Sequence, residues 1–211
     1  MRIYKLPSSG SSELELSKRL EPDLIHRLLY HPKYPEQVAL SAGKSEIFSV
    51  DPQSMKVKKK FPCLGTVKNE VSACPIAFSD AGNRVLVNVG CKLQVIPCTV
   101  DSDTKDISLQ MSEAVTRMIN EADLPKIKQP QEVGETGKFY AYTSSLSPDG
   151  KLVAVVLKDR IEICSSSTFK PTGQVIITSS QPSAVVFCPT DPSLLVAGEY
   201  SGEVTFHRLL V

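Results

Sequence analysis

The sequence predicts an all-β protein that is built from a repeated sheet unit. Four stretches share one arrangement: residues 24–50, 73–98, 142–165 and 182–209. Each contains, in order, an apolar strand, a turn rich in Pro, Asp or Gly, a second apolar strand, a polar turn and a third strand. Their first turns begin 48, 68 and 41 residues apart, at His31, Ser79, Ser147 and Cys188. A period of about 40 to 45 residues is typical of the four-stranded blade of a β-propeller. We therefore expect residues 1–211 to form a single propeller domain of about four blades.

The fourth strand of each blade is expected in the connecting stretches. Residues 54–61 (SMKVKKKF) and 172–179 (TGQVIITS) are typical of short strands, because they are rich in Val, Ile or Thr or alternate in polarity. Residues 1–8 and 14–20 match the third and fourth strands of an earlier blade, whereas the last unit stops after its third strand. Two arrangements fit this count: a small ring that residues 14–20 complete, or an open partial propeller. We favour the open form, with an edge that a partner chain or further sequence completes.

The longest spacing between units contains a predicted insertion, residues 100–139. Four apolar residues recur in it at helical spacing, with charged residues four apart beside them: Val115, Met118, Ile119 and Ala122, and Glu113, Arg117 and Glu121. This pattern predicts a short amphipathic helix over about 112–123. Residues 125–138 (PKIKQPQEVGETGK) contain two prolines and two glycines, which is a loop composition. We expect the insertion to be a helix with a loop at the periphery.

Three of the units resemble the blades of the WD40-repeat family. The stretch SLSPDGKLVAVVLKDRIEIC (145–164) is similar to that family's strand, Ser-Pro-Asp-Gly turn, strand, turn and strand. FCPTDPSLLVAGEYSGEVTFHRL (187–209) and YHPKYPEQVALSAGKSEIFSV (30–50) resemble variants of the same unit, so the likeness covers most of residues 24–211. The chain has no Trp and therefore no Trp-Asp dipeptide, and no Gly-His dipeptide. Without these signatures the blades are expected to rely on apolar packing. The resemblance implies a non-catalytic scaffold for protein–protein interaction, as a subunit of a multiprotein complex.

Composition limits the partners and the location that we expect. Lys and Arg number 24 and Asp and Glu 23, so no overall field attracts nucleic acid or an anionic membrane, and a charged partner must meet a local patch. No apolar run approaches 18 residues and no secretory signal is evident, which predicts no membrane insertion and an intracellular location, cytoplasmic or nuclear. The six cysteines form no C-x-x-C pair. We expect them to be reduced and Cys74, Cys164 and Cys188 to be largely buried.

A lysine run is the clearest charged feature and the candidate interaction patch: Lys56, Lys58, Lys59 and Lys60. Because alternate residues of a strand share a face, Lys56, Lys58 and Lys60 are expected to point together toward solvent. Such a run protects an exposed sheet edge, or it contacts RNA, a phosphoinositide or an acidic protein. Contact of the lysine run with RNA would give the alternative function, an RNA-associated or ribosome-biogenesis subunit. No aromatic residues alternate with the lysines as base stacking would require.

No residue pattern predicts catalysis, a cofactor or a metal site. Residues 134–139 (GETGKF) lack the first glycine and the Ser or Thr of a phosphate-binding loop. The three histidines, His26, His31 and His207, have no Cys, Asp or Glu near them at ligand spacing, and His31 is expected to be a turn residue. The candidate nucleophiles Ser79, Ser147 and Cys188 occupy the same place in successive units, which indicates turn geometry. We therefore expect a protein that is not an enzyme and has no cofactor.

Overall fold

The chain forms successive antiparallel sheets. The computed structural model describes residues 2–5, 15–19, 27–35, 39–42, 46–51, 56–62, 76–89, 92–123 and 144–210. In the first pair, β1 (Arg2–Lys5) lies antiparallel to β2 (Glu15–Arg19). The first four-stranded sheet has the order β3 (Arg27–Tyr30), β4 (Ala39–Ala42), β5 (Glu46–Val50) and β6 (Val57–Pro62). The strands predicted near the N-terminus and at 54–61 are thus confirmed.

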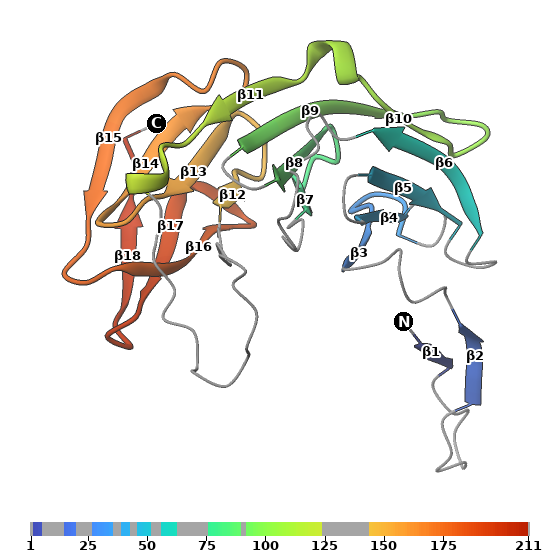
Figure 1. Ribbon diagram of the computed structural model, residues 1–211, viewed down its shortest axis with the longest axis horizontal. Coiled ribbons are helices and arrows are strands. Elements are labelled where there is room, and N and C mark those ends of the chain that lie inside the picture. Colours follow the sequence, from blue (N-terminus) through green and yellow to red (C-terminus); the bar gives the residue numbers. More distant parts are fainter. Residues whose placement is uncertain are drawn as a thin grey trace.

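The second sheet is the most elaborate. Its order is β7 (Ile76–Phe78), β8 (Arg84–Val89), β9 (Lys92–Val100) and β10 (Ile107–Leu109), and β11 (Val115–Met118) also pairs with β9. The third sheet consists of β12 (Ser144–Leu146), β13 (Leu152–Val156), β14 (Arg160–Ser165) and β15 (Pro171–Ile177). The fourth contains β16 (Pro182–Cys188), β17 (Asp191–Glu199) and β18 (Val204–Arg208). Figure 1 shows these sheets following one another along an arc, which confirms the four predicted units.

The helix predicted over 112–123 is wrong. This segment contains the 3₁₀ turn η1 (Met111–Glu113), strand β11 and the 3₁₀ turn η2 (Glu121–Asp123), and the described residues contain no α-helix. Strand β9 is nine residues long, and β10 pairs only with its last three residues. The backbone groups of residues 92–95 that point away from β8 would otherwise lack strand partners, and β11 supplies them. Pairing to a long neighbouring strand therefore overrides a weak helical periodicity.

Apolar clusters fill the space between consecutive sheets. Ile47 and Phe61 of the first sheet pack with Val85, Val87 and Ile96 of the second. A second cluster joins the second and third sheets, and a third cluster joins the third and fourth. Strands β8 and β13 have buried residues on both of their faces, because each lies in a sheet between two others. Their sequences are accordingly almost continuously apolar rather than alternating.

The first turns of successive sheets also contact one another. The Nε2 atom of His31 lies 2.9 Å from the Gly82 carbonyl oxygen, and the Ala81 N–H donates to the Pro148 carbonyl at 2.9 Å. The Phe187 N–H donates to the Ser145 hydroxyl at 3.1 Å, linking the third and fourth sheets. Each pair of neighbouring sheets is thus joined by at least one hydrogen bond in addition to its apolar cluster.

Candidate interaction surfaces

The lysine run lies on β6, the outer strand of the first sheet, but it does not present one face. Lys59 pairs with Ser49 and Val57 pairs with Val50, so Lys58 is an extra residue in a β-bulge. The Lys59 ammonium lies 5.2 Å from the centre of the Phe61 ring, on the side that packs against the second sheet. The Lys60 ammonium lies 5.6 Å from the Phe48 ring, on the opposite side. The expected common face of Lys56, Lys58 and Lys60 is therefore wrong, because the bulge shifts the alternation.

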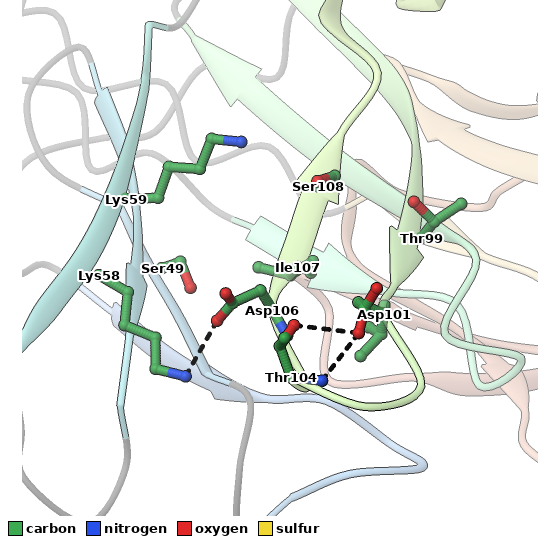
Figure 2. Close-up of a pocket in the computed structure, with 10 residues that line it drawn as sticks. Ser49, Lys58, Lys59, Thr99, Asp101, Thr104, Asp106, Ile107 and Ser108 are labelled. Atoms are coloured by element: carbon green, nitrogen blue, oxygen red, sulfur yellow. Dashed lines mark hydrogen bonds and ion pairs between the residues drawn. The ribbon is translucent and has the colours of Figure 1, made fainter.

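A cleft of about 520 Å³ separates β6 from the β9–β10 hairpin. Figure 2 shows Lys58 reaching across it to Asp106, with Nζ 3.1 Å from Oδ1. Asp101 is held by its own loop, since the backbone N–H groups of Thr104 and Asp103 donate to Oδ1 at 2.7 and 2.9 Å. These hydrogen bonds lower the pKa of the Asp101 carboxyl. Both carboxylates of the cleft are thus engaged by partners within the chain.

The chemistry of this cleft is polar and close to neutral. Two lysines and two aspartates line it together with the hydroxyl groups of four residues, Ser49, Thr99, Thr104 and Ser108. No carboxylate of the described residues pairs with Lys59, so that ammonium is the charge most available to a ligand. The cleft has no aromatic lining on which a base could stack. It suits a small polar group better than a nucleic-acid strand.

The residues considered for catalysis lie at turns. Ser79 and Ser147 are buried and accept hydrogen bonds from the N–H groups of Arg84 and Leu152 at 3.2 and 2.9 Å. Cys188 occupies the corresponding place in the fourth sheet and is half-buried, so the expectation that it is largely buried is wrong. Its pKa is lowered, chiefly by a hydrogen bond with the Thr190 hydroxyl. The Ser147 hydroxyl also donates to the Asp149 carboxylate at 2.7 Å, two residues later in the same turn. These contacts lie within the turns that they shape.

The structure describes some of the other candidate residues but not all of them. His31 is buried in its turn, and His207 of β18 lies 2.7 Å from the Thr205 hydroxyl. Cys98, Cys164 and Cys188 are free thiols. Residues His26, Cys74 and 134–139 lie outside the described residues. In the part of the chain that the structure describes, no group of three or more His, Cys, Asp or Glu side chains could hold a metal ion, and no helix is long and apolar enough to cross a membrane.

An open apolar face lies on the fourth sheet, and none of the charged or catalytic sequence motifs indicates it. Val186, Val196 and Phe206 are directly paired across β16, β17 and β18, so their side chains share one face. Val204 lies on the same face beside Phe206. The exposed fractions are 53% for Val186, 60% for Val204 and 71% for Phe206. We call this surface, made of Val186, Val196, Val204 and Phe206, the open face.

The opposite face of the same sheet is buried. Val185, Phe187, Leu195 and Ala197 pack there against the third sheet. Strand β17 is therefore apolar on both faces but covered on only one. The run LLVAG (194–198) carried this signal in the sequence, because a strand with one solvated face usually alternates between apolar and polar residues. Contiguous exposed apolar surface commonly marks an interaction site.

Comparison with known proteins identifies the architecture. No protein-family model matches the sequence, and no curated protein matches it. Among solved structures, the Cps50 (Swd1) β-propeller domain of Myceliophteria thermophila superposes with a TM-score of 0.60 at 12% identity, over 87% of this chain and 53% of that chain. The fold is a β-propeller, and it is structurally similar to WD40-type propeller domains. Hydrazine synthase from Kuenenia stuttgartiensis is a further match, with a TM-score of 0.50, 17% identity and coverage of 91% and 48%.

The chain is shorter than the solved chains named above: it spans about half the length of each. Among the described strands of this propeller, β18 pairs only with β17 and β2 pairs only with β1. In the described residues, β2 does not form the ring closure predicted for residues 14–20, and the described sheets follow an open arc. The last blade has three strands where the first and third have four.

Proposed function

We propose that this propeller is a non-catalytic scaffold for protein–protein interaction and a subunit of a multiprotein complex. The observation that carries the proposal is the open face, on which Val186, Val204 and Phe206 of β16 and β18 are exposed on either side of the half-buried Val196 of β17. Burying about 150 to 250 Å² of an aromatic side chain supports binding strongly, and aromatic residues are enriched at interface centres. Propeller blades are a rigid support for such a surface, since each is packed against its neighbours.

The open face can be tested against an equally apolar surface elsewhere. The full chain, the Phe206→Asp variant and the Ile177→Asp variant would be purified by an affinity tag from cells that express the protein. Ile177 on β15 is 75% exposed, so it is a matched control outside the open face. We expect partner chains in stoichiometric amounts with the unchanged chain and the control, and at least a tenfold loss with Phe206→Asp. Equal partner recovery in all three samples would contradict binding through the open face, and the absence of any stoichiometric partner would contradict the scaffold function.

The alternative, an RNA-associated subunit, depends on the lysine run. Its cations are divided, because Lys58 and Lys59 lie at the cleft while Lys60 lies on the other side of β6. One of them is also neutralised by Asp106. The two functions differ in salt dependence: phosphate contacts weaken steeply as salt rises, whereas an apolar contact does not. Repeating the purification at low and high salt, with RNA quantified, therefore separates them.

We further propose an intracellular location, in the cytoplasm or the nucleus. The balanced charge and the reduced state of the three described cysteines are in keeping with this proposal. Imaging of the tagged full-length protein tests it. Recovery of the protein from the culture medium or at the outer cell surface would contradict the proposal.

A further inference from the structure

The outer rims of the three junctions between the main sheets are filled differently. At the junction of the second and third sheets, Arg117 of β11 donates to Glu162 at 2.6 Å and to the Cys164 sulfur at 2.9 Å. At the junction of the third and fourth sheets, Gln174 of β15 donates to the Leu210 carbonyl at 2.7 Å and accepts a hydrogen bond from the Leu210 N–H at 2.8 Å. At each of these two rims, a polar side chain of the outer strand thus makes two hydrogen bonds to the next blade.

The rim between the first and second sheets leaves two polar groups without a partner. Lys58 of the outer strand β6 reaches Asp106, but the Lys59 ammonium pairs with no carboxylate of the described residues. Ser49 of β5 lies directly opposite Lys59, so the two side chains share the face toward the second sheet. Ser49 is only 4% exposed, and its hydroxyl has no hydrogen-bond partner in the part of the chain that the structure describes. Because buried hydroxyl groups are usually hydrogen-bonded, an unsatisfied one that lines a cleft indicates a position for a ligand.

The two unpartnered groups are both donors, and both belong to the cleft between β6 and the β9–β10 hairpin. Figure 2 shows Ser49 and Lys59 on the wall formed by the first sheet, with Thr104 and Asp106 on the opposite wall. The buried Phe61 ring lies 5.2 Å from the Lys59 ammonium and positions it without using its N–H donors. Residues directly opposite each other on paired strands have Cβ atoms about 4.5 to 5.5 Å apart. The ammonium and the hydroxyl can therefore donate to the same group of a ligand.

The charges of the cleft decide which class of group fits. Lys58 and Asp106 neutralise each other at 3.1 Å. Asp101 keeps its negative charge, because the N–H groups of its own loop stabilise the carboxylate. A ligand must therefore satisfy one free ammonium while it lies near two carboxylates. A carboxylate has a single negative charge, whereas a phosphate monoester has about 1.5 to 2 and is repelled more strongly by the two aspartates.

We propose that this cleft binds a carboxylate, with the Lys59 ammonium donating to one of its oxygens and the Ser49 hydroxyl to the other. Hydrogen bonds to a charged acceptor are shorter than those between neutral groups and about twice as strong. The cleft volume of about 520 Å³ lies in the usual range of ligand pockets, about 300 to 1,000 Å³, and admits an acidic side chain or a small carboxylic acid. This inference goes beyond the proposed scaffold function, which uses the open face of the fourth sheet.

Titration followed by nuclear magnetic resonance tests the class of ligand. The isotope-labelled full chain would be titrated with N-acetyl-glutamate methylamide, with its glutamine and phosphoserine counterparts, and with acetate. We expect saturable shifts of the Ser49 and Lys59 resonances with the glutamate probe, and at least tenfold weaker binding of the glutamine and phosphoserine probes. Acetate distinguishes the sources of the carboxylate: an affinity equal to that of the glutamate probe indicates a small acid, and a weaker one indicates an acidic side chain of a polypeptide. No saturable shift with either carboxylate, or equal or tighter binding of the glutamine or phosphoserine probe, would overturn the proposal.

Three variants test the two donors against a matched charge. Lys59→Gln and Ser49→Ala each remove one donor, and Lys60→Gln removes a neighbouring ammonium on the other side of β6. We expect the affinity for the glutamate probe to fall at least tenfold in Lys59→Gln and at least threefold in Ser49→Ala, and to stay unchanged in Lys60→Gln. Unchanged resonances in the third and fourth sheets verify that each variant is folded. Equal losses in Lys59→Gln and Lys60→Gln would overturn the proposal, because binding would then follow the overall charge of the strand.

Discussion

The imidazole of His31 links its own turn to Gly82 in the turn of the next blade. Its Nδ1 accepts a hydrogen bond from the Lys33 N–H at 3.2 Å, so the proton is on Nε2, which donates to the Gly82 carbonyl at 2.9 Å. The ring also stacks on Tyr34 and meets the Phe78 ring edge-on, with centroids 5.3 and 5.1 Å apart. This neutral tautomer satisfies both ring nitrogens, which explains why the turn histidine is buried.

Replacing Gly82 by alanine should destabilise the protein markedly. Gly82 has a φ of +69°, and an added Cβ would lie 2.4 Å from Cε1 of His31. The strain of a left-handed backbone and the overpacking against His31 should together lower the free energy of unfolding by about 2 to 4 kcal/mol. Denaturant unfolding measures this loss. Gly202 is the matched control, because its φ is +90° and no atom lies within 4 Å of the added Cβ. We expect Gly202→Ala to cost only about 1 kcal/mol; equal losses would show that the His31 contact does not matter.

Acidification should weaken the folded state through His31. Burial lowers the pKa of His31 most strongly, and nearby Lys33 lowers it further against the opposing hydrogen bond to Gly82. Below about pH 6.5 the His31 side chain therefore binds a proton more readily in the unfolded chain than in the folded chain. The free energy of unfolding falls as the pH decreases from there toward the pKa of His31 in the folded protein. The free energy of unfolding should change by at most about 1.4 kcal/mol per pH unit through this one group. Thermal unfolding between pH 7.5 and 5.5 measures it, and a slope unchanged in His31→Gln would refute this origin.

The three described cysteines should differ in reactivity. Burial raises the pKa of Cys98 to about 12, and burial also raises the pKa of Cys164 despite the opposing charge of Arg117. The pKa of Cys188 is lowered, and this residue is half-buried. Because the thiolate is the reactive form, brief iodoacetamide treatment at pH 8 should modify Cys188 well before the other two. Peptide mapping by mass spectrometry gives the order, and early modification of Cys98 would contradict the packing described.

The ion pair between Arg117 and Glu162 should stabilise the junction of the second and third blades. Arg117 of β11 donates to Glu162 at 2.6 Å and to the Cys164 sulfur at 2.9 Å. Burial raises the pKa of Glu162, but the hydrogen bonds and charges of Arg117 and Arg160 outweigh it, so the pKa is lowered overall. Arg117→Ala should cost about 1 to 2 kcal/mol. Arg208→Ala, which removes an exposed pair with Asp191, should cost less than about 0.5 kcal/mol; equal costs would contradict the prediction.

The repeat could be predicted from the sequence because its turns carry local information. The Ser147 hydroxyl and the positive φ of Gly150 depend on side chains and backbone freedom within a few residues, and these recur in SPDG and in SDAG (79–82). Apolar runs between such turns then define the strands. Four blades and most outer strands followed from these two signals.

The errors arose where pairing between distant segments decided the structure. Strand β11 exists because β9 extends beyond β10, a relation that no window around residues 112–123 contains. The bulge at Lys58 likewise depends on the register between β5 and β6. Because of this single inserted residue, Lys58 lies at the cleft together with Lys59, whereas Lys60 lies on the other side of β6. The open face was hidden for a similar reason, since its residues are far apart in sequence and meet only through cross-strand pairing.

The hydrogen-bonded turns and inter-sheet clusters also determine how the folded state opens. Each of the two inner sheets shares two interfaces, whereas the sheet of β16, β17 and β18 shares one through Val185, Phe187, Leu195 and Ala197. In a linear array of this kind, stability is close to a sum over nearest neighbours, and local unfolding starts at the unit with the fewest neighbours. The sheet of β3 to β6 likewise shares one. Proteolytic cleavage under native conditions should therefore begin in these two end sheets and advance toward the inner sheets one blade at a time.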